Sequence, residues 1–178
     1  MPRYVALFSS INVGRNRLKM ADLRAAFEAE GFSNVETVVA SGNVLFDHEK
    51  RPEVGLEEKL TLMMRHKFGM DSVALVRSRD ALAAAIADNP FAADGQENFV
   101  HTLFLDGPVD ADGFARLQSD RTGAERLAAG DRALHIDYVV GVAESKLVGT
   151  FIERRMGVRG TARNLRSMRR ILAKMDES

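Results

Sequence analysis

The sequence predicts an α+β protein of two similar halves in tandem, with an additional helix at its C-terminal end. Short apolar runs of strand character alternate with segments in which apolar residues recur at helical spacing. The order strand, helix, strand, strand, helix, strand is complete before residue 79, and a similar order begins again after residue 97. We therefore predict a first half over 1–78, a helix and linker over 79–97, and a second half over 98–178.

The first half is delimited by turn and helix-end signals between its apolar runs. Met20, Leu23 and Phe27 recur at helical spacing, and Gly31 ends that helix. The Ser41-Gly42 dipeptide predicts a hairpin turn between two β-rich runs. The predicted elements are a strand over 3–8, a helix from about 20 to 30, strands over 35–39 and 43–46, a helix between Pro52 and Gly69, and a strand over 72–77.

The second half repeats these signals and is longer at its end. A short helix over 79–87 ends before the Asn89-Pro90 pair, because the residue before a proline disfavours helical backbone. The remaining predicted elements are a strand over 99–105, a helix over 111–118, strands over 125–129 and 133–139, a helix over 144–155, and a final helix from about 162 to 175.

Composition excludes several kinds of site. The chain has 178 residues, is 46% hydrophobic and contains no cysteine, which rules out disulfides, thiolate zinc sites and cysteine nucleophiles. No residue pattern indicates a cofactor, and the four histidines lack metal-ligand spacing. Neither a signal-peptide pattern nor an apolar run of membrane-spanning length is found. We therefore expect a cytoplasmic location.

The net charge is zero, but the charges are unevenly distributed along the chain. Acidic residues dominate between positions 80 and 137. Basic residues dominate between 146 and 174, where only Glu153 opposes them; they are Lys146, Arg154, Arg155, Arg159, Arg163, Arg166, Arg169, Arg170 and Lys174. Such asymmetry can concentrate the electrostatic field at one surface of a neutral protein.

The predicted final helix is amphipathic. One stripe is apolar and consists of Leu165, Met168, Leu172 and Met175. The opposite stripe is basic and consists of Arg163, Arg166, Arg170 and Lys174. Arg163 and Arg166 fall in the first turns of this helix, where the helix dipole disfavours cations. A solvated surface explains the basic stripe, and an anionic partner explains it as well.

Three polar segments at the ends of apolar runs are candidate ligand-binding loops. Their Asn, Gly, Ser and Arg residues offer backbone amides and guanidinium donors to an anion. The loop after the first strand has neither Walker nor dinucleotide-binding spacing, and a hairpin turn alone explains Gly42. The candidate ligand-binding residues are Asn12, Gly14, Arg15, Ser41, Gly42, Asn43, Arg163, Asn164, Arg166 and Arg170.

The sequence contains no clear catalytic constellation. Ser145 and Lys146 are adjacent, whereas a serine–lysine pair usually has the spacing Ser-x-x-Lys, so we interpret Ser145 as a cap for the following helix. Tyr4, Phe8 and Phe46 occupy strands that stack bases in RNA-recognition modules. The core signature of those modules is missing, and we expect this sheet face to pack against the other half of the chain.

Four motifs together resemble a known family. They are the run from Tyr4 to Gly14, the Ser-Gly-Asn segment followed by Val44 and Phe46, the Ser145-Lys146-Leu147 triplet, and the late Thr-x-Arg-Asn segment. In this order they resemble the family catalogued as domain of unknown function 1697. The resemblance implies a duplicated ferredoxin-like β-α-β-β-α-β topology, and it implies no agreed activity.

The leading functional hypothesis is binding of an anionic ligand, either nucleic acid or a phosphorylated small molecule, through the polar loops and the basic helix. One alternative is an enzyme that acts on a small phosphorylated or carboxylated substrate, with the same arginines orienting it. Another is a protein-interaction domain whose motifs are purely structural. The sequence alone leaves open whether the protein is an enzyme, and it predicts no membrane partner.

Overall fold

The computed structural model describes residues 1–178 except 10, 12–16, 40–41 and 178. Within the described residues it contains two four-stranded antiparallel sheets and six α-helices. The predicted α+β class is therefore confirmed. None of the helices in the described part of the chain is both long and apolar enough to cross a membrane.

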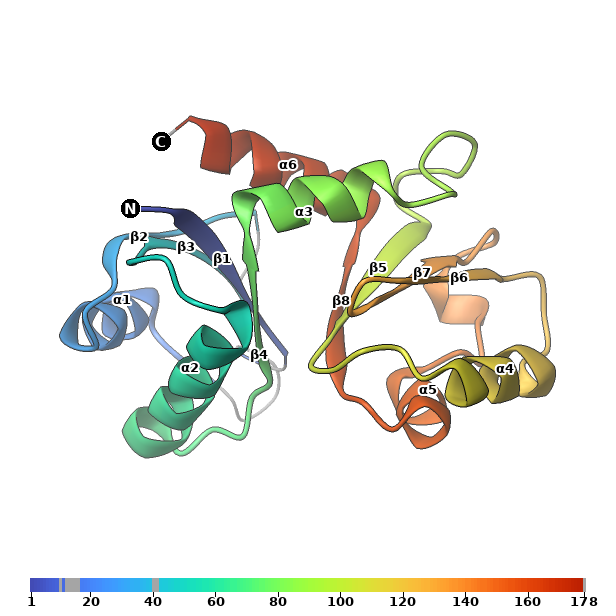
Figure 1. Cartoon of the computed structure of the whole chain (residues 1–178), viewed down its shortest axis with the longest axis horizontal. Helices are drawn as coiled ribbons and strands as arrows, with labels where there is room; N and C mark the ends of the chain where they lie inside the picture. Colours follow the sequence, from blue (N-terminus) through green and yellow to red (C-terminus); the bar gives the residue numbers. More distant parts are fainter. Residues whose placement is uncertain (10, 12–16, 40–41, 178) are drawn as a thin grey trace. The chain divides into compact units, whose positions relative to one another are not determined.

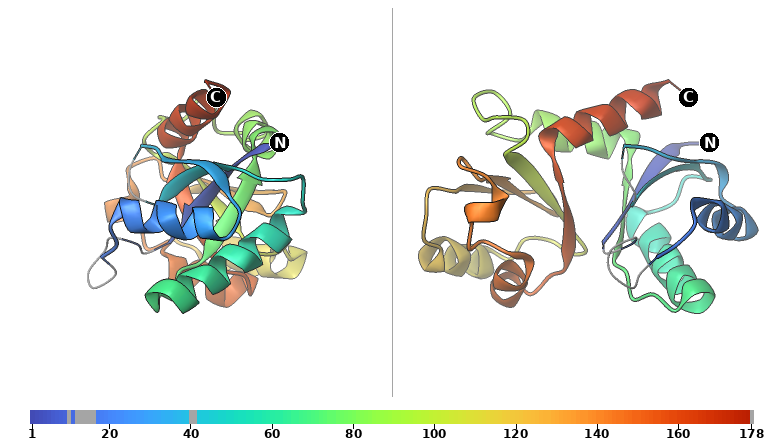
Figure 2. Two further views of the ribbon diagram at one scale, coloured as in Figure 1. Left: turned by 90° about the vertical axis from the view of Figure 1, so that its left-hand side faces the viewer. Right: turned by 180° about the vertical axis from the view of Figure 1, so that it is seen from behind.

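The first sheet has the strand order β2-β3-β1-β4 (Figure 1). Helices α1 and α2 cover the same face of it, as two views agree (Figures 1 and 2). Each predicted element of the first half is present within a few residues of its predicted ends. The observed bounds are β1 Arg3–Phe8, α1 Met20–Ala29, β2 Ser33–Thr37, β3 Asn43–Asp47, α2 Glu53–Phe68 and β4 Ala74–Ser78.

The second sheet has the strand order β6-β7-β5-β8, and α4 and α5 cover one of its faces (Figure 2). Helix α3 precedes it in the chain, and a short 3-10 helix, η1, follows β7. The observed bounds are α3 Arg79–Ala87, β5 Val100–Leu105, α4 Ala111–Asp120, β6 Arg126–Gly130, β7 Ala133–Asp137, η1 Val142–Glu144, α5 Gly149–Met156, β8 Gly160–Asn164 and α6 Leu165–Asp176.

The chain divides into two compact units. The first contains Met1–Leu82 together with the residues from Arg170 onward, and the second contains Ala83–Arg169. The last turns of α6 thus group with the first unit, whereas the predicted second half contains all of 98–178.

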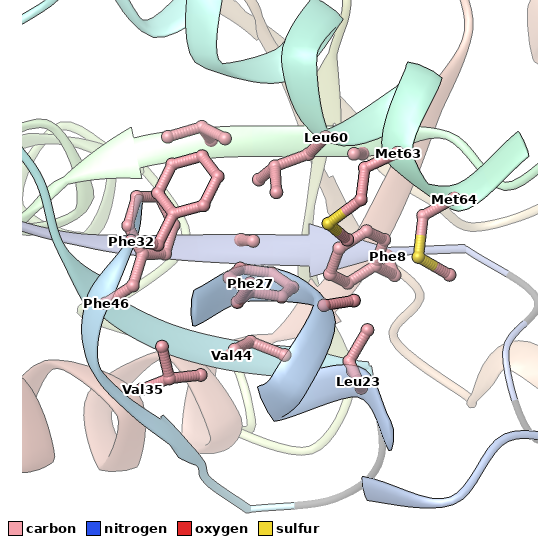
Figure 3. Packing of buried hydrophobic residues seen from close by; sticks show 14 of the residues in the cluster. Phe8, Leu23, Phe27, Phe32, Val35, Val44, Phe46, Leu60, Met63 and Met64 are labelled. Carbon is pink, nitrogen blue, oxygen red and sulfur yellow. The ribbon is translucent and has the colours of Figure 1, made fainter. Parts of the chain in front are cut away.

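The core of the first unit lies between one sheet face and the two helices (Figure 3). The ring of Phe27 on α1 lies 6.1 Å from that of Phe8 and 5.7 Å from that of Phe46. Tyr4 stacks on Phe46 at 5.6 Å. The expectation that this aromatic face packs against the other half is therefore wrong, because α1 and α2 cover it within the first unit.

Two predicted helices of the second half differ from the structure. Residues 160–164, partly assigned to the final helix, form the edge strand β8, because their backbone pairs with β5 from His101 to Leu105. The predicted helix over 144–155 begins only at Gly149. Before it, the Ser145 hydroxyl accepts a hydrogen bond from the Leu147 amide at 3.0 Å and donates to the Glu125 carboxylate, which holds this segment as a loop.

Helix α6 is amphipathic, as predicted, but its buried stripe differs by one position. Leu165, Met168, Ile171 and Met175 are buried, whereas Leu172 is only partly buried.

Candidate anion-binding site

The described ends of two predicted ligand-binding loops meet at one end of the first sheet. The Phe8 amide donates to the Gly42 carbonyl at 2.8 Å, and Leu7 on β1 pairs with Asn43 on β3. β4 begins at the same place, where the Ser9 amide donates to the Val73 carbonyl at 3.0 Å. The antiparallel register of β1 with β3 thus brings Phe8, the last residue of β1, beside Gly42, which directly precedes β3.

The polar groups described at this end stabilise the loops themselves. Ser9 Oγ accepts a hydrogen bond from the Val73 amide at 3.1 Å, and Ser72 Oγ donates to the Ser9 carbonyl. Asn43 is 2% exposed, and its side-chain amide donates to the Val38 carbonyl at 3.3 Å. Gly42 has φ = +96°, a backbone conformation that glycine adopts at little cost. The predicted ligand residues Asn12, Gly14, Arg15 and Ser41 lie outside the described residues.

Arg163 lies on β8 and not in the final helix as predicted. Its Nη1 donates to Thr161 Oγ1 and to the Ala162 carbonyl, both at 2.9 Å. Burial lowers the pKa of its guanidinium to about 10, because a desolvated cation is less stable than a hydrated one. These contacts make Arg163 a partly buried residue of the sheet.

Asn164 is the N-cap of α6. Its Oδ1 accepts a hydrogen bond from the Ser167 amide at 2.8 Å, as short polar side chains at this position commonly do. The Arg166 amide donates to the Glu97 carbonyl at 3.3 Å. The protein itself therefore uses these two amides of the helix N-terminus, and an anion need not bind them.

Arg166 and Arg170 are exposed and lie one turn apart on α6. Among the described residues, neither side chain has a hydrogen-bond or ion-pair partner. Three other cations of the basic segment are paired with acids, two of them from distant parts of the chain. These pairs are Arg169–Glu97 at 2.6 Å, Arg155–Asp120 at 2.9 Å and Lys174–Glu177 at 3.1 Å.

A second polar group, not predicted from the sequence, surrounds Arg126 in the second unit. Its guanidinium contacts Asp94 at 3.0 Å and Asp137 at 2.6 Å, and it lies over the Phe91 ring. The group lines an open depression of about 350 Å³. Hydrogen bonds from Arg126 lower the pKa of Asp94. The sequence contained no signal for this group, since its acids lie 32 and 11 residues from Arg126.

The described part of the chain contains no group of three His, Asp or Glu side chains arranged to hold a metal ion. The predicted residues divide between the two units: Gly42, Asn43 and Arg170 belong to the first, and Arg163, Asn164 and Arg166 to the second. Of the described candidates, only Arg166 and Arg170 present side chains that the fold leaves exposed and without a partner.

Comparison with known proteins identifies the family. Residues 1–135 match the model of the family described as protein of unknown function (DUF1697). The chain belongs to the DUF1697 family. The matched region ends within β7, before α5, β8 and α6, so the membership of this DUF1697 chain depends on residues 1–135 and not on the basic helix.

A solved structure supports the fold of this DUF1697 protein. The conserved bacterial protein SP0830 from Streptococcus pneumoniae is similar with a TM-score of 0.77 and 24% sequence identity, and the match covers 99% of each chain. At this identity the likeness shows the fold alone. No curated protein matches the chain.

Proposed function

We propose that this DUF1697 protein binds an anionic, phosphate-bearing ligand and that Arg166 and Arg170 on α6 supply the contacts. The supporting observation is selective pairing: the fold gives Arg169 a carboxylate partner at 2.6 Å, whereas Arg166 and Arg170 on the same helix have none among the described residues. Guanidinium groups bind phosphate through paired, charge-assisted hydrogen bonds.

The positions of Arg166 and Arg170 on α6 are electrostatically unfavourable for two cations. Like charges four residues apart on a helix repel each other by a few tenths of a kcal/mol. Arg166 lies in the first turn, where the helix dipole also disfavours a cation, and that turn contains no acidic residue. An anion bound between the two side chains would relieve both effects.

We favour a phosphorylated small molecule over nucleic acid as the ligand. Tyr4, Phe8 and Phe46 are at most 3% exposed and pack beneath α1 and α2, so this face offers no aromatic platform to bases. Pairing of Arg155, Arg169 and Lys174 with acids also reduces the positive field that a polyanion would meet. An enzyme acting on such a molecule, and a protein-interaction domain, remain the alternatives.

The test compares Arg166→Ala/Arg170→Ala with the matched control Arg169→Ala. Thermal shift would be measured at low salt with inorganic phosphate, nucleotides, sugar phosphates and short oligonucleotides. A ligand at a hundredfold excess over its dissociation constant adds about 2.7 kcal/mol of stability. We expect a small phosphate ester to raise the melting temperature of the wild type and of R169A, and the double variant to lose that rise.

Three other results would each point to a different interpretation. A shift with oligonucleotides alone would favour nucleic acid. A shift that persists in R166A/R170A would contradict the assignment of the ligand to these arginines. The same melting temperature with every ligand would favour the protein-interaction reading.

We further infer that both halves are ferredoxin-like and that the protein is cytoplasmic. Support for the fold is the strand order β2-β3-β1-β4, which recurs as β6-β7-β5-β8 with the helices in the same places in the chain. The proposed halves are 1–78 and 98–178, joined by the helix and linker over 79–97. The sequence contains no cysteine, and this absence does not distinguish the cytoplasm from an oxidising compartment. Cell fractionation tests the location.

A further inference from the structure

The edge of the first sheet has a feature that the proposed function does not use. β4 is the last strand in the order β2-β3-β1-β4, so every second backbone amide along it points away from the sheet. Unpaired amides on an edge strand are sites where another chain can add a strand. Two such amides, those of Val76 and Ser78, are instead bonded to side chains of α2.

The acceptors are two glutamates one helical turn apart. Glu57 Oε2 accepts from the Val76 amide at 2.8 Å, and Glu53 Oε2 accepts from the Ser78 amide at 2.7 Å. Their spacing of four residues on α2, about 6 Å along the helix axis, nearly matches the two-residue spacing of the amides on β4, about 6.8 Å. The two carboxylates therefore occupy the positions that carbonyl oxygens of an added strand would occupy.

Glu57 is held in place by a second contact. It is 6% exposed, and the same Oε2 atom accepts from Arg77 Nη1 at 2.9 Å. Arg77 is itself 4% exposed and also donates to the Val76 carbonyl at 2.8 Å. A charged acceptor fixed in this way forms a stronger hydrogen bond than a neutral carbonyl would.

We infer that Glu53 and Glu57 close the β4 edge to strand addition, and that a second copy of this chain would pair with β4 if they were removed. The second copy is the partner expected because its own β4 would present the same amides and carbonyls, and antiparallel pairing of identical edges makes a two-fold symmetric contact. In the native chain the carboxylates exclude that contact.

Hydrogen exchange at single amides tests the closure directly. We expect Glu53→Ala to accelerate exchange at the Ser78 amide by about tenfold or more, since a hydrogen bond to a charged group is lost. Glu53→Gln keeps an oxygen acceptor and should retain most of the protection. Glu58→Ala, an exposed residue of the same helix, should leave the exchange of Ser78 unchanged. Equal exchange in the wild type and Glu53→Ala would overturn the inference.

A measurement of self-association tests whether β4 pairs with a second copy once these carboxylates are removed. Removing Glu57 alone would leave Arg77 buried without this carboxylate, so the chain tested carries Glu53→Ala, Glu57→Leu and Arg77→Met together. We expect its mass in analytical ultracentrifugation to rise with concentration above that of the wild type, while Glu58→Ala stays at the wild-type mass. A folded triple variant, checked by circular dichroism, that keeps the wild-type mass would overturn the inference. If the triple variant is unfolded, exchange at Ser78 in Glu53→Ala decides.

Discussion

Thr102 on β5 and His135 on β7 are paired on neighbouring strands of the second sheet, and Thr102 Oγ1 lies 2.9 Å from His135 Nδ1. Thr102 is 0% exposed and His135 is 2% exposed. A buried polar pair of this kind satisfies both groups only while both are present. The contact between Thr102 and His135 therefore stabilises this sheet only as long as both side chains are present.

Replacing Thr102 with valine should destabilise the protein. The change keeps the side-chain shape but leaves His135 Nδ1 buried without its hydroxyl partner, at a cost of about 1–3 kcal/mol. Urea denaturation measures the difference. Thr37→Val, at an exposed position of β2, is the control and should change the free energy of unfolding by less than about 0.5 kcal/mol. Equal effects of the two substitutions would contradict the prediction.

Stability should fall as the pH is lowered below about 6.5. Burial lowers the pKa values of His135 and His101 from their ordinary value of 6.5. The unfolded chain therefore takes up protons at a higher pH than the folded chain, and the stabilisation present above pH 6.5 is lost as the pH falls toward the folded pKa values. The slope is at most about 1.4 kcal/mol per pH unit for each histidine.

Replacing His135 with asparagine shows how much of this pH dependence of stability comes from His135. We expect urea midpoints measured between pH 5 and pH 8 to vary less in His135→Asn than in the wild type, because one titrating group is gone. His66→Gln, at an exposed position of α2, should keep the wild-type profile. Identical profiles for His135→Asn and the wild type would show that His135 does not contribute.

Replacing Asn164 with alanine should weaken α6 by about 1 kcal/mol, because the Ser167 amide loses its capping acceptor. Asn164→Ser should retain most of the stability, since serine caps helices as well as asparagine does. Thermal denaturation distinguishes the variants. Full stability in Asn164→Ala would contradict the capping role and restore Asn164 as a candidate for ligand binding.

Replacing Gly160 with alanine should destabilise the protein. A Cβ atom at this position would overlap the Phe104 carbonyl oxygen across the β5–β8 pair. The strand would have to shift, at a cost of about 1–3 kcal/mol. Gly149→Ala is the matched control, because no atom lies within 4 Å of its added Cβ. Chemical denaturation of both variants should show a loss for Gly160→Ala only.

The elements predicted best were those whose own residues carry the signal. β1 was predicted with its observed bounds, since Arg3–Phe8 is a compact apolar run. The helix between Pro52 and Gly69 was predicted at both ends, and the left-handed conformation of Gly69, with φ = 62°, explains why it ends there. Local patterns sufficed in these places because local and tertiary preferences agree.

The misassigned residues are those whose conformation depends on distant partners. Residues 160–164 are rich in polar side chains and read as the start of a helix, yet they pair with β5 about sixty residues earlier in the chain. The candidate site shows the same effect. Arg163, Arg166 and Arg169 look equivalent in the sequence. In the structure Arg163 lies in a strand, and of the two exposed arginines only Arg169 has a carboxylate partner among the described residues, Glu97.

The sequence by itself determined the α+β class, most strand and helix positions, the family, and the presence of an excess of cations near the C-terminus. Hydrophobic periodicity and turn residues act over a few positions, so they can be read along the chain. Only the tertiary structure decided which cations remain unpaired, which sheet edge is closed, and which histidines are buried. Those properties depend on contacts such as Arg155–Asp120 and Arg77–Glu57 between residues 20 to 35 positions apart, for which the sequence carries no local signal.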